Sequence, residues 1–131
     1  MNASATITAG GNNDYSQRLY ALKREMEASP GQHYTIQSAA KQSCMSTSSL
    51  TTGFKRLFGI SFHRYLLSLR LLLAASLLAE TYEPLNAIVK KAGFVTASGF
   101  NKAFKKRYGV SPSAFRLHYS KWDYENFSKR S

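Results

Sequence analysis

The chain of 131 residues repeats itself at an interval of about 50 residues, and this repeat limits the possible folds more than any other feature. Identical pairs at that interval include Ser48 and Ser98, Phe54 and Phe104, Lys55 and Lys105, Gly59 and Gly109, and Ser61 and Ser111. Upstream the interval falls to 49, which pairs Ala40 with Val89 and Cys44 with Gly93. Each copy is therefore predicted to hold a short helix, a tight turn and a longer helix, with one extra residue in the second turn.

Apolar periodicity and capping signals place the helices. The predicted spans are 14–28, 36–42, 47–58, 62–80, 84–92, 97–108, and 112 to between 116 and 119. Asp14 and Gln17 have the spacing of a capping box for the first helix. In helix 62–80, the inward stripe is predicted to be Phe62, Tyr65, Leu66, Leu69, Leu73 and Leu77. No segment alternates as a strand would, so we expect an all-α fold with seven helices.

The predicted organisation has three parts. Residues 1–13 are small and polar and are expected to be a disordered lead. Residues 14–118 form one domain of two helix-turn-helix subdomains, about 37–58 and 85–108, joined by the long linking helix. Residues 119–131 form an aromatic tail, which either packs on the domain or belongs to a partner interface.

The net charge of +11 lies entirely in the middle of the chain. Residues 28–122 contain 13 Lys and Arg, against Glu80 and Glu83 as the only acids. A field of that sign attracts the phosphates of nucleic acids or anionic lipids, although a merely soluble basic surface is the plain alternative.

A short helix, a turn and a second helix match the helix-turn-helix arrangement, in which the second helix buries one face and offers the other to a DNA groove. Short polar side chains on that offered face can approach base edges. The predicted base-contacting residues are Ser48, Thr51 and Thr52 in the first copy, and Ala97, Ser98, Asn101 and Lys102 in the second. The predicted phosphate contacts are Ser46, Thr47, Lys55, Arg56, Thr96, Lys105 and Lys106. The alternative for each of these residues is ordinary solvated helix surface.

The linking helix has about 19 residues and a length of roughly 28 Å, close to the roughly 34 Å of one turn of B-DNA. Two recognition helices at that separation enter successive major grooves, so one chain is enough to bind an asymmetric site. We therefore expect a monomer for this chain, with a dimer as the alternative if it belongs to a longer regulator.

The motifs closely resemble those of the AraC/XylS family of bacterial transcription regulators. They are Leu50-x3-Phe54-Lys55-x3-Gly59-x-Ser61, Tyr65-Leu66-x3-Arg70-Leu71-x2-Ala74-x2-Leu77-Leu78, Gly93-Phe94, and Phe100-x3-Phe104-Lys105-Lys106-x2-Gly109-Val110-Ser111-Pro112-x3-Arg116. The resemblance covers residues 35–116 and implies binding to double-stranded promoter DNA, with activation through RNA polymerase. One departure is Cys44, which stands where the first turn of the family often has glycine.

Other classes of function find less support in the sequence. No catalytic triad, phosphate-binding loop or metal-ligand cluster is recognisable, so we predict no enzyme, no cofactor and no metal site. One cysteine and no secretory signal favour a cytoplasmic protein, with no membrane as partner. Two alternatives stay open: a non-specific basic binder of nucleic acid, and a basic amphipathic protein that binds membranes or acidic partners.

Overall fold

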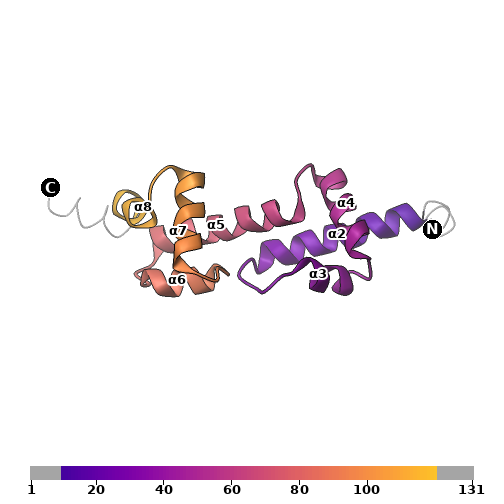
Figure 1. Ribbon diagram of the computed structural model, residues 1–131, viewed down its shortest axis with the longest axis horizontal. Coiled ribbons are helices and arrows are strands. Elements are labelled where there is room, and N and C mark those ends of the chain that lie inside the picture. The colour runs from indigo at the N-terminus through magenta and orange to yellow at the C-terminus, as the bar shows by residue number, and fades with distance from the viewer. Residues whose placement is uncertain (1–9, 121–131) are drawn as a thin grey trace. The chain divides into compact units, whose positions relative to one another are not determined.

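The computed structural model describes residues 10–120, and within that range it contains seven helices and no strand, as predicted (Figure 1). The helices are α2 (Gly10–Ala28), α3 (Ile36–Gln42), α4 (Thr47–Phe58), α5 (Phe62–Glu80), α6 (Leu85–Lys91), α7 (Ala97–Tyr108) and α8 (Pro112–Tyr119). The chain divides into two compact units. The N-terminal unit ends at Leu66 and the C-terminal unit begins at Leu67, so α5 contributes to both.

Hydroxyl side chains fix the starts of the helices at the predicted positions, because each accepts a hydrogen bond from an N–H of the first turn. Ser46 accepts from Ser49 at 3.1 Å, and Thr96 accepts from Gly99 at 3.0 Å. Thr35, Ser61 and Ser111 cap α3, α5 and α8 in the same way. The predicted bounds of these helices are therefore confirmed.

The start predicted for the first helix is wrong. Helix α2 begins at Gly10, so Asp14 lies inside the helix and does not cap it. Asp14 instead forms an ion pair of 2.6 Å with Arg18, four residues on. The predicted disordered lead overlaps this helix at residues 10–13, and its remainder, residues 1–9, lies outside the described range.

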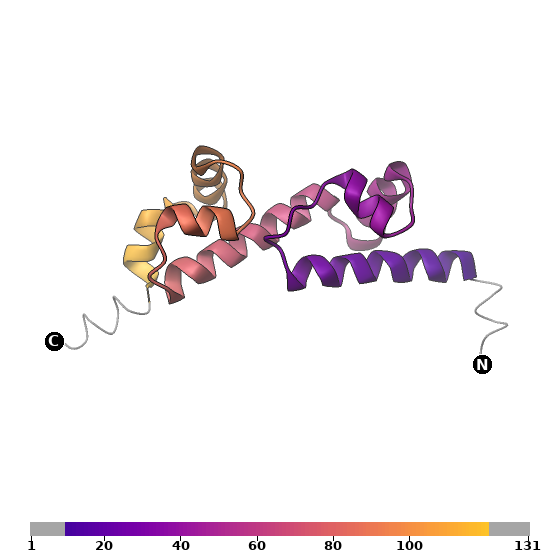
Figure 2. The same ribbon diagram turned by 90° about the horizontal axis from the view of Figure 1, so that it is seen from below.

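The N-terminal unit packs α2 and α3 against α4, and α2 lies along the α3–α4 pair (Figure 2). The buried apolar residues of this core are Leu19, Leu22, Met26, Ala39, Ala40, Leu50, Phe54, Phe62 and Leu66. Phe54 is at the centre, and the ring of Phe62 packs edge-on against it at a centroid distance of 5.8 Å. The Phe54 stripe of α4 is thus confirmed, while Leu57 is only half-buried.

The C-terminal unit has a separate core, in which α7 contacts both α6 and α8. Its buried members are Leu71, Ala74, Ala75, Leu78, Ile88, Val89, Ala92, Phe100 and Phe104. Phe104 takes the place that Phe54 has in the first copy, with Phe115 packed edge-on at 5.3 Å. Equivalent residues of the sequence repeat therefore lie at equivalent places in the two cores.

The stripe predicted for the C-terminal half of α5 is wrong. Leu69, Leu73 and Leu77 are only half-buried, and the fully buried positions are Leu71, Ala74, Ala75 and Leu78. A helix advances by about 100° per residue, so these positions face away from the Phe62 and Leu66 side that the first core buries. The half of α5 in the C-terminal unit thus buries its own stripe, which the stripe predicted from Phe62 and Leu66 does not describe.

Helix α5 is therefore apolar around much of its circumference. By length and composition alone it could cross a membrane, but a third of its most apolar window is buried inside the protein. The burial of Leu66 in one core and Leu78 in the other accounts for part of this composition, whereas Leu67 and Leu72 are exposed.

A polar cluster joins α2 to the start of α5 in the N-terminal unit. The Lys23 ammonium lies 2.7 Å from the Glu27 carboxylate and 5.3 Å from the centroid of the Tyr65 ring. The Tyr65 hydroxyl donates to the same carboxylate. The hydrogen bond from Lys23, followed by that from Tyr65, lowers the pKa of Glu27.

This lowered pKa gives a pH-dependent contribution to stability. Because the folded protein protonates Glu27 less readily than the unfolded chain does, the contribution is present above the unfolded pKa of about 4.3 and is lost at lower pH. We expect Glu27→Gln to be less stable than the parent at pH 7, with the difference shrinking below about pH 4. Urea unfolding at several pH values measures it, and a constant difference down to pH 3 would contradict the cluster.

Candidate nucleic-acid interface

The first helix-turn-helix consists of α3, a turn at residues 43–46, and α4. Ala39 and Ala40 are buried, which allows α3 and α4 to pack closely. The Met45 N–H donates to the Ala40 carbonyl at 2.8 Å and closes the turn. Cys44 adopts φ of +56°, a left-handed conformation that costs a residue with a Cβ about 1–2 kcal/mol. This explains why glycine suits the position, and why Cys44 is a strained substitute.

The second helix-turn-helix consists of α6, a turn at residues 92–96, and α7. Gly93 has φ of +91° and supplies the left-handed residue without a steric penalty. The Phe94 N–H donates to the carbonyl of buried Val89 at 3.0 Å, just as Met45 does in the first turn. The second turn has five residues where the first has four, which confirms the extra residue.

All seven predicted base-contacting residues are exposed. On α4 these are Ser48, Thr51 and Thr52, and on α7 they are Ala97, Ser98, Asn101 and Lys102. The opposite faces of the same helices carry Leu50 and Phe54, and Phe100 and Phe104, which have no exposed surface. Each second helix is thus divided into a fully buried apolar face and an exposed, mainly polar face.

The free face of α4 borders a shallow hollow. Ile36 from the start of α3 lines it together with Thr47, Ser48, Thr51 and Thr52. Thr47, predicted as a phosphate contact, therefore lies beside the candidate base contacts of its helix. The hydroxyls that line the hollow bring hydrogen-bonding groups to a concave surface.

The six predicted phosphate contacts other than Thr47 fall into two groups. Lys55, Arg56, Lys105 and Lys106 are exposed in the last turns of α4 and α7, where their charges also complement the carbonyl end of the helix. Ser46 and Thr96 are helix caps whose side-chain oxygens already accept backbone hydrogen bonds. Their hydroxyl hydrogens are what they can still offer to a phosphate.

Three further basic residues, which were not among the predicted contacts, are exposed in the last turns of the helix-turn-helix helices. Lys41 and Lys90 are exposed in the last turns of α3 and α6. They are equivalent under the 49-residue interval that pairs Ala40 with Val89, so the sequence repeat could have identified them as a corresponding basic pair. Arg107 extends the basic end of α7, with its guanidinium 5.7 Å from the centroid of the Tyr108 ring.

Positive charge is unevenly shared between the units. Residues 10–66 contain seven Lys or Arg and three acids, whereas residues 67–120 contain eight Lys or Arg and two acids. One of those two acids, Glu83, is paired with Lys91. The described part of the C-terminal unit therefore has the stronger attraction for an anionic partner. Among the described residues, no three His, Cys, Asp or Glu side chains are grouped so that they could hold a metal ion.

Comparison with known proteins identifies this architecture. A family model described as "Helix-turn-helix domain" matches residues 39–118. The RCS-specific HTH-type transcriptional activator RclR of Escherichia coli K12 is 31% identical over 99 residues, which cover 76% of this chain and 35% of that protein. The chain belongs to the AraC/XylS family of transcription regulators. This is a family of DNA-binding regulators and not of enzymes.

Solved AraC-type domains have the same fold. The C-terminal domain of AraT, a response regulator from Geobacillus stearothermophilus, superposes with a TM-score of 0.75 at 31% identity, covering 79% of this chain and 86% of that one. The DNA-binding domain of AdpA, solved in complex with a target DNA, gives a TM-score of 0.74 at 22% identity over 77% and 91% of the two chains. The seven-helix fold is therefore that of an AraC-type DNA-binding domain.

The chain spans about a third of the length of the curated relatives it matches. The shares are 26% for the probable regulator LumQ of Photobacterium leiognathi and 35% for RclR. The match locates the DNA-binding part of such regulators within this chain.

Proposed function

We propose that this AraC-family protein binds an asymmetric promoter site as a monomer, with α4 and α7 entering successive major grooves on one side of the duplex. The division of both helices into a buried apolar face and an exposed, mainly polar face supports this proposal most directly. The length of α5, 19 residues or about 28 Å, is compatible with a spacing of one DNA turn.

The two recognition helices contribute unequally in this proposal. Asn101 has an amide that can bind adenine in a bidentate manner, and Lys102 can donate to guanine. The free face of α4 offers only the hydroxyls of Ser48, Thr51 and Thr52. We assign most base discrimination to α7, and a larger share of phosphate binding and DNA-shape recognition to α4.

The regulatory outcome we propose is activation through contact with RNA polymerase in the cytoplasm. RclR, a relative of this chain, carries the name of a transcriptional activator. Selection of binding sites from random duplexes tests the DNA-binding function, and transcription from the recovered site tests the activation. Recovery of no enriched motif would favour a non-specific binder, and binding to lipid vesicles without duplex binding would favour the amphipathic alternative.

One pair of variants separates base contacts from phosphate contacts on α7. Asn101→Ala should cost about 1–3 kcal/mol on the selected site and relax preference at one base pair. Lys105→Ala should weaken binding to all duplexes alike and reduce the slope of log affinity against log salt by about 1. Titrations on selected and scrambled duplexes at several salt concentrations measure both effects. Uniform loss in Asn101→Ala would contradict a base contact there, and an unchanged slope in Lys105→Ala would mean a solvated lysine.

A further inference from the structure

Val95 is the one residue of the second turn that has no counterpart in the first. Met45 and Phe94 correspond, because each N–H donates to the same carbonyl position of the preceding helix. Ser46 and Thr96 correspond as the caps of α4 and α7. Met45 is joined directly to Ser46, whereas Val95 stands between Phe94 and Thr96. Val95 is therefore the extra residue of the longer turn.

The turn holds Val95 outward. On one side, Phe94 is half-buried and packs against Phe100 at a ring distance of 5.1 Å. On the other side, the Thr96 hydroxyl accepts the Gly99 N–H and fixes the start of α7. Between these two anchors the Val95 side chain is 93% exposed. A β-branched side chain on a fixed backbone has few rotamers, so it loses little entropy when a partner covers it.

Val95 lies directly before the cap of the recognition helix α7, which distinguishes it from exposed apolar residues elsewhere on the surface. Residues at the N-terminal end of a recognition helix contact base edges in the major groove. Val95 is two residues from Ala97, the one apolar residue among the predicted base contacts. The polar side chains of Ser98, Asn101 and Lys102 follow along the same helix. An apolar pair thus precedes the hydrogen-bonding groups.

We infer that Val95, together with Ala97, recognises the C5-methyl group of a thymine in the half-site bound by α7. In the major groove the thymine methyl is the only apolar group among the four unmodified bases, so an apolar contact distinguishes thymine from cytosine. This inference rests on the proposed DNA binding and names a specificity-determining residue within it. Val95 supplies the apolar contact, and Asn101 and Lys102 supply the hydrogen bonds.

Deoxyuridine substitution tests the inference, because it removes the methyl group and leaves every hydrogen-bonding atom of the base in place. The probe is the duplex selected by the wild-type chain, with each thymine of the α7 half-site replaced in turn. We expect one replacement to weaken wild-type binding about fourfold, the effect of leaving one methyl group unburied. Val95→Ala should lose most of the preference for thymine and keep only the part that Ala97 contributes, while Val95→Ile should keep the full preference.

Leu117→Ala is the matched control. Leu117 is also apolar and 69% exposed, but it lies on α8, outside both helix-turn-helix motifs. Its removal should leave the effect of deoxyuridine unchanged. Because Val95 packs against nothing that folding requires, circular dichroism and thermal unfolding of Val95→Ala should match the wild type.

Two results would distinguish a failure of the Val95 contact from a failure of the proposed DNA-binding function. If a motif is selected but Val95→Ala shows the same deoxyuridine penalties as the wild type, the Val95 contact is refuted and the proposed function stands. If no motif is selected, the proposed function itself fails.

Discussion

Replacing Arg116 with methionine is expected to lower the free energy of unfolding of the C-terminal unit by about 2–3 kcal/mol. The guanidinium donates from Nε to the Leu78 carbonyl at 3.2 Å and from Nη2 to the Thr81 carbonyl at 3.1 Å. These carbonyls lie at the C-terminal end of α5, where no further helical N–H is available to them. A fixed positive charge also stabilises this negative end of the helix dipole. Methionine preserves most of the packing volume and removes both donors.

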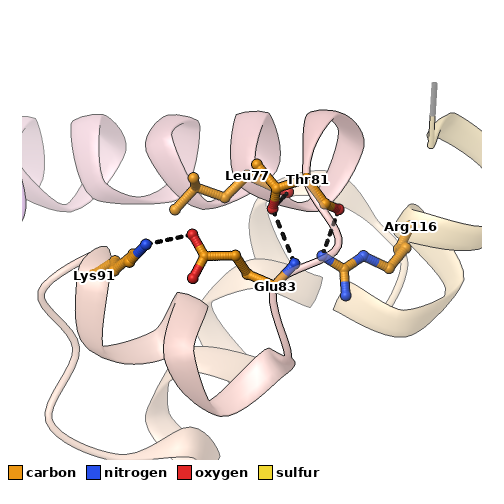
Figure 3. Close-up of polar contacts among 5 residues, drawn as sticks. All are labelled: Leu77, Thr81, Glu83, Lys91 and Arg116. Carbon is orange, nitrogen blue, oxygen red and sulfur yellow. Dashed lines mark hydrogen bonds and ion pairs between the residues drawn. The ribbon is translucent and has the colours of Figure 1, made fainter. Parts of the chain in front are cut away.

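Figure 3 shows that Arg116 belongs to a small network around the end of α5. The Thr81 hydroxyl donates to the Leu77 carbonyl at 2.6 Å and accepts from the Glu83 N–H at 3.2 Å. Arg116→Lys, which keeps the charge but not the two-donor geometry, should lose about half as much stability as Arg116→Met. Urea unfolding followed by circular dichroism measures both. Equal stability of Arg116→Met and the wild type would show that water replaces the guanidinium without loss.

Gly53→Ala is expected to destabilise the N-terminal unit by about 2 kcal/mol, although alanine is the better helix former. Gly53 is buried in α4 beneath Tyr15 of α2, whose hydroxyl donates to the Ser49 carbonyl. A Cβ at Gly53 would lie 2.7 Å from Cζ and 2.8 Å from Cε2 of the Tyr15 ring. Those distances are too short for carbon atoms, so the Tyr15 ring must turn aside and lose its hydrogen bond to Ser49, or α2 must shift away from α4.

The sign of this effect should depend on Tyr15. In a Tyr15→Ala background the obstruction is gone, and Gly53→Ala should then stabilise the chain by about 1 kcal/mol through helix propensity. Ala103 is the equivalent of Gly53 in the repeat, so Ala103→Gly is the matched control and should cost about 1 kcal/mol. If Gly53→Ala has the same effect with and without Tyr15, the close approach of α2 and α4 is not its cause.

Local chemistry made most helix bounds predictable. Thr35, Ser46, Ser61 and Ser111 act over three residues, so neighbouring sequence is enough to place them. The face of α5 was not predictable in the same way. Its leucines satisfy several stripes, and which stripe is buried depends on which helices pack on each half. The start of α2 was missed because the Asp14–Gln17 pair looks like a cap but lies within the helix.

The candidate site was predictable to the extent that exposure follows from periodicity. Buried Phe54 and Phe104 fix the outward faces of α4 and α7, so Thr51 and Asn101 were correctly expected to be exposed. Which turn residue points outward could not be obtained that way. The outward position of Val95 depends on hydrogen bonds that anchor its neighbours, and no periodic pattern encodes them.

The left-handed turn residue of the first helix-turn-helix is also the only cysteine of the chain, and it is exposed. A thiol-specific reagent therefore addresses one of two homologous motifs and leaves the other unmodified in the same molecule. A spectroscopic label on Cys44 would report on the first motif alone, without any engineered substitution. The second turn has Gly93 at the equivalent position, which a thiol reagent does not modify. The second motif therefore serves as an unlabelled internal control in the same molecule.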